Sequence, residues 1–250
     1  MLCQETIMKY LHKKITVHLY DSIGSTNDEA KRRADADGGV CLYAAEHQSA
    51  GRGRRGRSFY SPKGTGLYMT LALPYADVSE AVCGITCAAA VAVCETVESL
   101  SNHHPQIKWV NDIFVGGKKV AGILTELITD DHNQPRAVIV GIGLNLNTAE
   151  FPAELAATAG NLGAIEKNAL CGMIADRLIT MTEQYDNNSV MEKYKGRNLC
   201  IGRRITYMQD GVEHLATAVD IDAGGGLVVE ENGLRTTLNA GEISVTPLSP

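Results

Sequence analysis

The chain has 250 residues, of which 44% are hydrophobic and 21% are charged, and its formal net charge is -6. These proportions are those of an ordinary globular protein, which excludes disordered, collagen-like and coiled-coil chains. No run approaches the roughly 18 to 20 apolar residues that span a bilayer, and the N-terminus has no apolar signal core, so we expect a cytoplasmic protein with no membrane partner.

The first predicted elements are two strands with a helix between them. Residues 15–21 and 40–46 are rich in β-branched and aromatic side chains, which predicts strands. Thr26 and Glu29 have the spacing of a capping box ahead of a short helix over residues 28–36. The polar side chains at this helix start, which either cap it or line a pocket, are Ser25, Thr26 and Asn27.

A strongly positive segment follows over residues 47–63. It contains no acid and five cations: Arg52, Arg54, Arg55, Arg57 and Lys63. Of the 23 basic residues, 18 lie elsewhere in the chain against 29 acidic residues, a net charge of -11. A positive loop in an acidic protein is typical of a site for one compact anion. The acidic total argues against a general nucleic-acid-binding surface.

Within this segment, residues 51–56 (GRGRRG) match the dinucleotide-binding pattern GxGxxG. That motif requires a helix to follow, and Pro62, Gly64 and Gly66 prevent one. We interpret the segment as a flexible loop whose arginines donate to phosphate or carboxylate oxygens. Phe59 directly after the loop favours a nucleotide over a solvated basic loop, with single-stranded nucleic acid as an alternative.

A strand over residues 67–73 and a long helix over residues 77–100 come next. This helix carries three of the chain's seven cysteines on one face, and the chain has no CxxC pair and no zinc-like cluster with histidine. We therefore expect inert core thiols rather than a redox or metal site.

Strand candidates then crowd together over residues 106–147, namely 106–110, 113–115, 119–128 and 136–147. The Gly116-Gly117 pair predicts a hairpin, and hence antiparallel neighbours. Because strands and helices do not alternate regularly, the pattern indicates an α+β fold, a mixed sheet with helices on one side.

The rest of the chain consists of a helical region followed by a region of short strands. Residues 152–194 are helical in pattern, with one face formed by Leu170, Ile174, Leu178, Met181 and Tyr185. Short strands separated by glycine turns follow. We therefore expect a domain of residues 1–198 and a small β-barrel of residues 199–250.

A second polar group lies on the crowded strands. Lys108, Asn111, Asp112 and Lys119 would present two cations, an amide and a carboxylate to one pocket. Such groups suit a phosphoryl substrate with its magnesium ion, because lysine neutralises phosphate oxygens and aspartate binds the hard cation. A sheet-edge lysine kept for solubility is the alternative, and it fits Lys118 better than Lys119.

Together these motifs resemble those of biotin protein ligases, in order and approximate spacing. They are STN at 25–27, EHQSAGRGRRGR at 46–57, KWVND at 108–112, KKVAGILTEL at 118–127 and GIGLNLN at 141–147. The resemblance is strong over residues 15–147 and looser beyond them. One departure is Val110, where the family usually has proline.

The resemblance implies a fold related to class II aminoacyl-tRNA synthetases, with an SH3-like C-terminal barrel. It implies that biotin and MgATP give biotinoyl-5'-AMP and pyrophosphate, and that a lysine of a biotin carboxyl carrier domain then takes the biotinoyl group. The implied catalytic residues are Arg54, Lys119 and Asp112, the last as a magnesium ligand or as an orienting acid.

The resemblance also assigns binding residues. The implied biotin contacts are Ser25, Thr26, Asn27, Gln48, Gly51, Arg52, Arg54, Lys119 and Gly122. The implied ATP contacts are Arg54, Arg55, Arg57, Phe59, Lys108, Asn111, Lys119 and Asn145.

Other function classes stay open at this point. A lipoate-attaching ligase shares the fold and the adenylate chemistry. A non-catalytic biotin sensor or an RNA-binding module would keep the basic loop without needing Lys119 and Asp112 together. Only 24 residues precede Ser25, too few for the helix-turn-helix domain of repressor members, so we expect no DNA binding. The sequence does not choose between a monomer and a homodimer.

Overall fold

The structure is a computed structural model that describes residues 1–75, 82–183, 186–209, 211–239 and 245–247. Its helices are α1 (Gln4–Met8), α2 (Thr26–Asp37), α3 (Val82–Leu100), α4 (Ala153–Ala156), α5 (Lys167–Glu183) and α6 (Asn187–Arg197). Its strands are β1 (Thr16–Tyr20), β2 (Cys41–Ala45), β3 (Gly66–Pro74), β4 (Gln106–Lys108), β5 (Asp112–Val115), β6 (Lys118–Thr129), β7 (Pro135–Asn145), β8 (Arg204–Gln209), β9 (Val212–Ile221), β10 (Leu227–Glu231), β11 (Leu234–Leu238) and β12 (Val245–Pro247).

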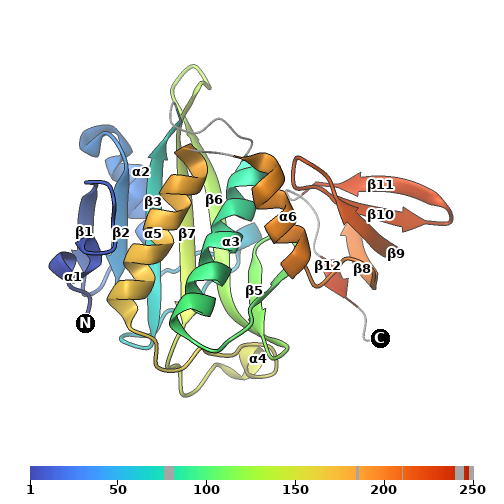
Figure 1. The fold of residues 1–250 in the computed structure, drawn as a ribbon, viewed down its shortest axis with the longest axis horizontal. Coiled ribbons are helices and arrows are strands. Elements are labelled where there is room, and N and C mark those ends of the chain that lie inside the picture. The colour runs from blue at the N-terminus through green and yellow to red at the C-terminus, as the bar shows by residue number, and fades with distance from the viewer. Residues whose placement is uncertain (76–81, 184–185, 210, 240–244, 248–250) are drawn as a thin grey trace.

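Seven strands form one mixed sheet in the order β1-β2-β3-β7-β6-β5-β4 (Figure 1). The β1–β2 pair is parallel, whereas the remaining pairs are antiparallel. The β5–β6 hairpin turns at Gly116 and Gly117, whose φ angles of 57° and 76° are costly for residues with a side chain. The predicted mixed α+β class and its hairpin are confirmed.

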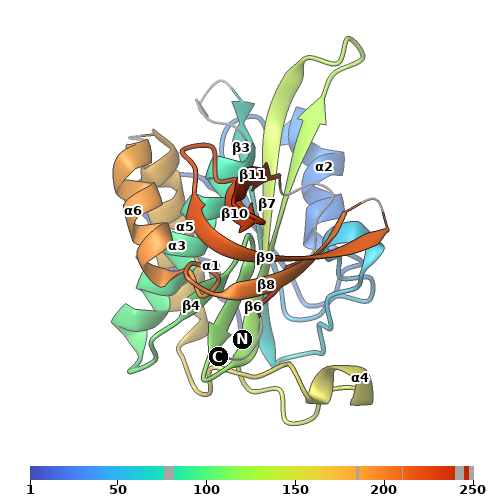
Figure 2. The same cartoon turned by 90° about the vertical axis from the view of Figure 1, so that its right-hand side faces the viewer.

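Helices cover both faces of this sheet. Leu71 and Val140 belong to the main core that includes α3 and α5, whereas Tyr43 and Ile139 lie in a smaller cluster with Ala30 of α2. Figure 2 shows α2 on one side of β6 and β7, and α3, α5 and α6 on the other. The expectation of helices on one side is wrong. Because α2 is mostly polar, its apolar pattern does not reveal that it packs on a sheet.

The central helix α3 is apolar over most of its length. By length and composition it could cross a membrane, contrary to the expectation that no apolar run is long enough, but 72% of its apolar window is buried inside the fold. A helix with this pattern at the centre of a protein is a core helix. Residues 77–81 of the predicted helix lie outside the described residues.

The burial of the cysteines largely agrees with the expectation of core thiols. All seven are free, and five are buried, namely Cys41, Cys87, Cys94, Cys171 and Cys200. Cys83 is half-buried and Cys3 is exposed, so the expectation of a core position is wrong for Cys3.

The start of α2 is one residue earlier than the capping box predicted. Ser25 is the N-cap, and its Oγ accepts from the Asp28 N–H at 3.4 Å. The Thr26 hydroxyl instead donates to Gln48 Oε1 at 3.0 Å, and Glu29 pairs with Arg32. A tertiary partner thus decides which of two neighbouring hydroxyls caps the helix.

After the large sheet, the predicted helical region divides into α4, α5 and α6. Leu170, Ile174 and Leu178 are fully buried, Met181 packs at the edge of the core, and Tyr185 lies outside the described residues. Strands β8 to β12 form a second, antiparallel sheet in the order β11-β10-β9-β8-β12.

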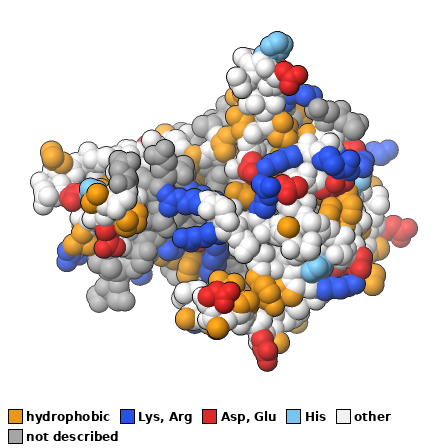
Figure 3. Space-filling view, turned by 180° about the vertical axis from the view of Figure 1, so that it is seen from behind, with side chains coloured by type: hydrophobic (Ala, Val, Ile, Leu, Met, Phe, Trp, Pro, Cys, Tyr) orange, Lys and Arg blue, Asp and Glu red, His pale blue; other side chains and the backbone are white. Residues whose placement is uncertain are grey.

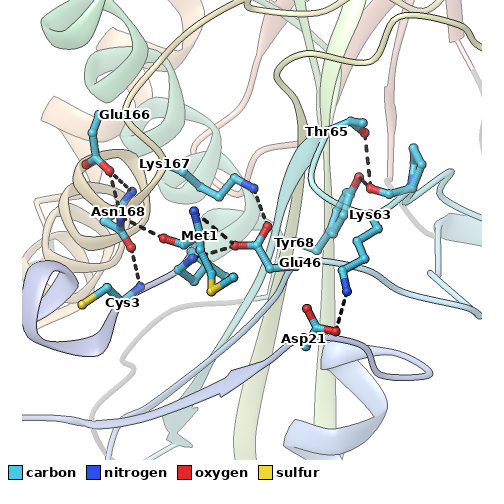
Figure 4. Close-up of polar contacts among 12 residues, drawn as sticks. Met1, Cys3, Asp21, Glu46, Lys63, Thr65, Tyr68, Glu166, Lys167 and Asn168 are labelled. Carbon is cyan, nitrogen blue, oxygen red and sulfur yellow. Dashed lines mark hydrogen bonds and ion pairs between the residues drawn. The ribbon is translucent and has the colours of Figure 1, made fainter.

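A buried ion pair joins the start of the chain to α5 (Figure 4). The Glu46 carboxylate accepts from Lys167 Nζ at 2.7 Å and from the Leu2 N–H at 2.6 Å. Burial alone would raise the pKa of Glu46, but these bonds hold the pKa below its ordinary value of 4.5. A lowered folded-state pKa stabilises the protein above the unfolded pKa, and this contribution is lost as pH falls through the folded pKa.

We expect Glu46→Gln to lower the free energy of unfolding at pH 7 by about 1–3 kcal/mol, because a charged hydrogen bond is lost inside the fold. The difference from the parent should shrink as pH falls below about 4.5, because the carboxylate of the unfolded parent chain takes up a proton there before that of the folded protein does. Urea unfolding at pH 7 and pH 4 measures both values, and an equal loss at the two pH values would contradict this role.

Candidate active site

A cavity of about 680 Å³ opens on the face of the large sheet that carries α2. Figure 3 shows the molecule from this side, with Lys and Arg side chains gathered beside the small sheet and over the main body. Among the described residues, seven cations line the cavity, namely Arg52, Arg54, Arg55, Arg57, Lys108, Lys119 and Arg203, and the one acid is Asp112. Such an excess of positive charge suits an anionic ligand.

The floor of the cavity is built from glycines on β6 and β7. A Cβ atom at Gly141 would lie 2.0 Å from Asn27 Oδ1, and one at Gly143 would lie 2.5 Å from Phe59 Cε1. At Gly122 the nearest atoms, on Lys119 and Phe59, would be 3.4 Å away. The absence of side chains therefore lets α2 and the Phe59 ring approach the sheet closely.

A network of polar side chains closes one end of the cavity. Gln48 Oε1 accepts from the Thr26 N–H at 2.8 Å. Thr70 Oγ1 lies 2.8 Å from Thr26 Oγ1 and 2.7 Å from Asn27 Oδ1. Asn27 Nδ2 donates to Glu126 Oε2 at 2.8 Å. These bonds fix the first turn of α2 against β3 and β6, so its polar groups are already positioned for a ligand.

Residues 51–59, the basic loop, form a tight turn of the backbone. The Phe59 N–H donates to the Gly51 carbonyl at 2.9 Å, and the Gly53 N–H donates to the Arg57 carbonyl at 2.7 Å. Arg55 has a φ of 58°, in the left-handed region. A Cβ atom at Gly51 would lie 2.5 Å from the Phe59 carbonyl oxygen, so this glycine allows the loop to close on itself.

Arg54 reaches from this loop to the strands that carry the KWVND motif. Its Nη1 donates to Asn111 Oδ1 at 3.2 Å, and Asn111 Nδ2 donates to the Ile123 carbonyl at 2.7 Å. Burial lowers the pKa of Arg54 from its ordinary value, yet an arginine remains charged at neutral pH. The structure thus holds a partly desolvated cation above the cavity.

Lys119 and Asp112 form the second charged element of the site. Lys119 Nζ lies 2.6 Å from Asp112 Oδ1, and 35% and 25% of the two side chains are exposed. The described residues contain no group of three or more His, Cys, Asp or Glu side chains that would hold a metal ion. Magnesium often binds through one or two carboxylates plus substrate phosphates, and Asp112 fits that pattern.

Most of the predicted site residues are brought together in the cavity. They are Ser25, Thr26, Asn27, Gln48, Arg52, Arg54, Arg55, Arg57, Phe59, Lys108, Asn111, Asp112, Lys119 and Gly122. Gly51 and Asn145 are not among the lining residues. Gly51 lies at the base of the loop, and the buried Asn145 amide donates to the Gly160 carbonyl at 3.1 Å. The Asn145 amide thus holds the segment that follows α4.

Several lining residues were missed by the sequence analysis. Leu155, Ala157 and Thr158 form part of one wall, and Arg203 enters from the small sheet. No motif marks the first three. The Arg203-Arg204 pair just beyond the predicted domain boundary was the one local sign of a further cationic contact.

Comparison with known proteins agrees with this geometry. Residues 21–145 match the biotin/lipoate A/B protein ligase family. The chain is 32% identical over 236 residues to a biotin--[acetyl-CoA-carboxylase] ligase of Mycobacterium tuberculosis, which covers 88% of this chain and 85% of that protein. It is 33% identical over 234 residues to the bifunctional ligase/repressor BirA of Bacillus subtilis, covering 88% and 71%.

The fold is also similar to that of solved structures. A biotin protein ligase from Aquifex aeolicus in complex with biotin and ATP superposes with a TM-score of 0.81 at 23% identity, covering 93% of this chain and 99% of that one. The family match over half of the chain, and relatives above 30% identity over most of their length, settle the relationship. This chain belongs to the biotin/lipoate A/B protein ligase family.

Proposed function

We propose that this protein is a biotin ligase that activates biotin with MgATP and attaches it to a lysine of an acceptor protein. The observation that carries the proposal is the convergence of Arg54 and Lys119 on a glycine-floored cavity beside the polar network of Thr26 and Gln48. The names of the relatives, which are biotin ligases, support biotin over lipoate.

In the first step, an oxygen of the biotin carboxylate attacks the α-phosphorus of ATP. The bond from that phosphorus to its bridging oxygen breaks, and pyrophosphate leaves with the electron pair. Carboxylate and triphosphate repel each other, so Arg54 and Lys119 stabilise the encounter by neutralising both. The Phe59 ring offers an apolar face for the base. Magnesium would supply further neutralisation, with Asp112 as its protein carboxylate.

In the second step, the neutral amine of an acceptor lysine attacks the biotinoyl carbonyl. The amide forms, AMP leaves, and the amine loses a proton to solvent or to a nearby base. Until then the reactive mixed anhydride must be kept from water, and the basic loop that covers the cavity is suited to this exclusion.

Finer features belong to the same proposal. We assign residues 1–198 to the ligase domain and residues 199–250 to an SH3-like barrel, supported by the separate five-stranded sheet. The acceptor would be a biotin carboxyl carrier domain. A cytoplasmic location, a possible homodimer and the absence of DNA binding stay predictions.

Biotin-dependent exchange between ATP and pyrophosphate tests the proposal. We expect exchange of labelled pyrophosphate into ATP with biotin present, and none with lipoate or without an acid. Exchange with lipoate alone would assign the chain to the lipoate branch of the family. No exchange with either acid would favour the alternative that the protein is a non-catalytic binding module.

Arg54→Gly should weaken retention of the adenylate, because it removes a partly desolvated cation and its bond to Asn111. Escaped biotinoyl-AMP then labels lysines on unrelated proteins. The measurement is biotin incorporation into albumin, a non-acceptor protein. Lys63→Gly is the control, since Lys63 belongs to the same positive segment, is exposed, pairs with Asp21 and does not line the cavity. Equal labelling by Arg54→Gly and the parent would remove the retention role.

A further inference from the structure

One cation reaches the cavity from outside the motif-bearing segments. Arg203 lies in the turn between α6 and β8, and it lines the cavity together with Lys108 and Gln106 of β4. The Arg203 N–H donates to the Cys200 carbonyl at 3.0 Å, and the Arg203 carbonyl accepts from the Ala218 N–H at 3.0 Å. The small sheet therefore sets the position of this arginine.

Arg203 and Lys108 share one end of the cavity because the chain after α6 runs beside β4. The Leu199 N–H donates to the Ile107 carbonyl at 2.9 Å, and Asn198 and Ile107 form a parallel bridge. The Trp109 indole N–H also donates to the Gly225 carbonyl of the small sheet's β9–β10 turn at 2.9 Å. These contacts flank Lys108 on both sides, so its strand and the small sheet hold one another in place.

The charges of the cavity divide into a paired and an unpaired group. Lys119 pairs with Asp112 at 2.6 Å and Arg52 pairs with Asp28 at 3.0 Å, whereas Arg54 donates a hydrogen bond to the uncharged amide of Asn111. Across the described part of the chain, no ion pair is formed by the other lining cations, which are Arg55, Arg57, Lys108 and Arg203. Unpaired cations in one cavity repel each other, and a ligand with several negative charges relieves that repulsion.

We infer that Arg203 joins Lys108, already an implied ATP contact, in binding the β- and γ-phosphates of ATP and in stabilising the pyrophosphate as it leaves. This inference rests on the proposed function. When the bond between the α-phosphorus and the bridging oxygen breaks, its electron pair stays on that oxygen, and the negative charge of the leaving group rises. A guanidinium fork can bind two of its oxygens at once, and a neighbouring ammonium adds a point charge. The small sheet thereby becomes part of the ATP site.

An acidic surface of the acceptor is the other anion that Arg203 could meet. Arg203 lines the same cavity as Lys108, which favours phosphate. The two partners act at different steps, since pyrophosphate takes part in adenylate formation, whereas the acceptor takes part in transfer alone. Measurements of the separate steps therefore distinguish them.

The test compares Arg203→Ala and Arg203→Lys with Arg204→Ala, a matched control because Arg204 is exposed and does not line the cavity. For Arg203→Ala we expect the KM for ATP in biotin-dependent exchange to rise about 10- to 100-fold, as for a lost charged hydrogen bond. Pyrophosphate binding to the free protein, measured by calorimetry, should weaken by a similar factor. Arg203→Lys should be intermediate, and Arg204→Ala should match the parent.

Single-turnover transfer from preformed biotinoyl-AMP to a biotin carboxyl carrier domain should be unchanged in Arg203→Ala. An unchanged KM for ATP, or a loss confined to this transfer step, would overturn the inference. If the parent protein itself shows no biotin-dependent exchange, the proposed function fails. The calorimetric comparison of pyrophosphate binding then still decides whether Arg203 contacts the phosphates.

Discussion

Lys119→Ala should lower kcat for biotin-dependent exchange between ATP and pyrophosphate by about 10²–10³-fold, the usual cost of removing one preorganised charge from a reacting centre. The Lys119 ammonium is held 2.6 Å from Asp112 above the glycine floor. No other described cation is placed on β6 within the cavity, so nothing on that strand replaces it. Because 25% of the Asp112 side chain is exposed, water can solvate the remaining carboxylate, and the fold should survive.

Lys118→Ala is the matched control for this prediction. Lys118 is the preceding residue on the same strand, is exposed, and donates to the Ala157 carbonyl rather than entering the cavity. We expect a kcat close to that of the parent. Exchange by Lys119→Ala within tenfold of the parent would show that Lys119 does not act on the reacting groups, and thermal unfolding checks that both variants are folded.

Gly141→Ala should weaken biotin binding by displacing α2. The new Cβ would lie 2.0 Å from Asn27 Oδ1. The β7 backbone cannot retreat, because Gly141 is paired with Thr70 of β3 on one side and Leu124 of β6 on the other. Asn27 must therefore move, and its contacts to Thr70 at 2.7 Å and Glu126 at 2.8 Å are lost.

The expected result is a loss of about 10²-fold in kcat/KM for biotin, as for a misplacement of about 1 Å in a binding site. Overpacking should also lower the free energy of unfolding by about 1–3 kcal/mol. Gly196→Ala is the control, because nothing lies within 4 Å of its Cβ and it is inside helix α6. That change should raise stability by up to about 1 kcal/mol. Unchanged kinetics with biotin in Gly141→Ala would contradict the role given to Asn27.

The sheet was predictable where its pattern is local. Strands β6 and β7 are long, apolar and bounded by glycine or turn residues, so their position and their hairpin partners follow from the sequence. The face of the large sheet on which α2 packs was not predictable. Its twelve residues are mainly polar, and it is held by hydrogen bonds from Thr26 and Asn27 to residues 22 and 99 positions away.

The motifs predicted most of the residues that line the cavity, but not those that tertiary structure brings in. Asn145 lies in a matching motif, yet its amide bonds to the Gly160 carbonyl instead of lining the cavity. Arg203 lies in no motif, and its place depends on the pairing of Ile107 with Asn198. A single sequence carries no signal for a contact between segments about ninety residues apart.

Alternate residues of β7 face the hydrophobic core and the ligand cavity. Val140 and Ile142 belong to the hydrophobic core, whereas Gly141 and Gly143 face Asn27 and Phe59. Deleting a single residue here would exchange the two sets, so isoleucine would fill the ligand cavity and glycine would leave a void in the core. Removing two residues preserves the alternation. We therefore expect that deleting an even number of residues from β7 preserves its two faces, whereas deleting an odd number destroys folding and ligand binding together.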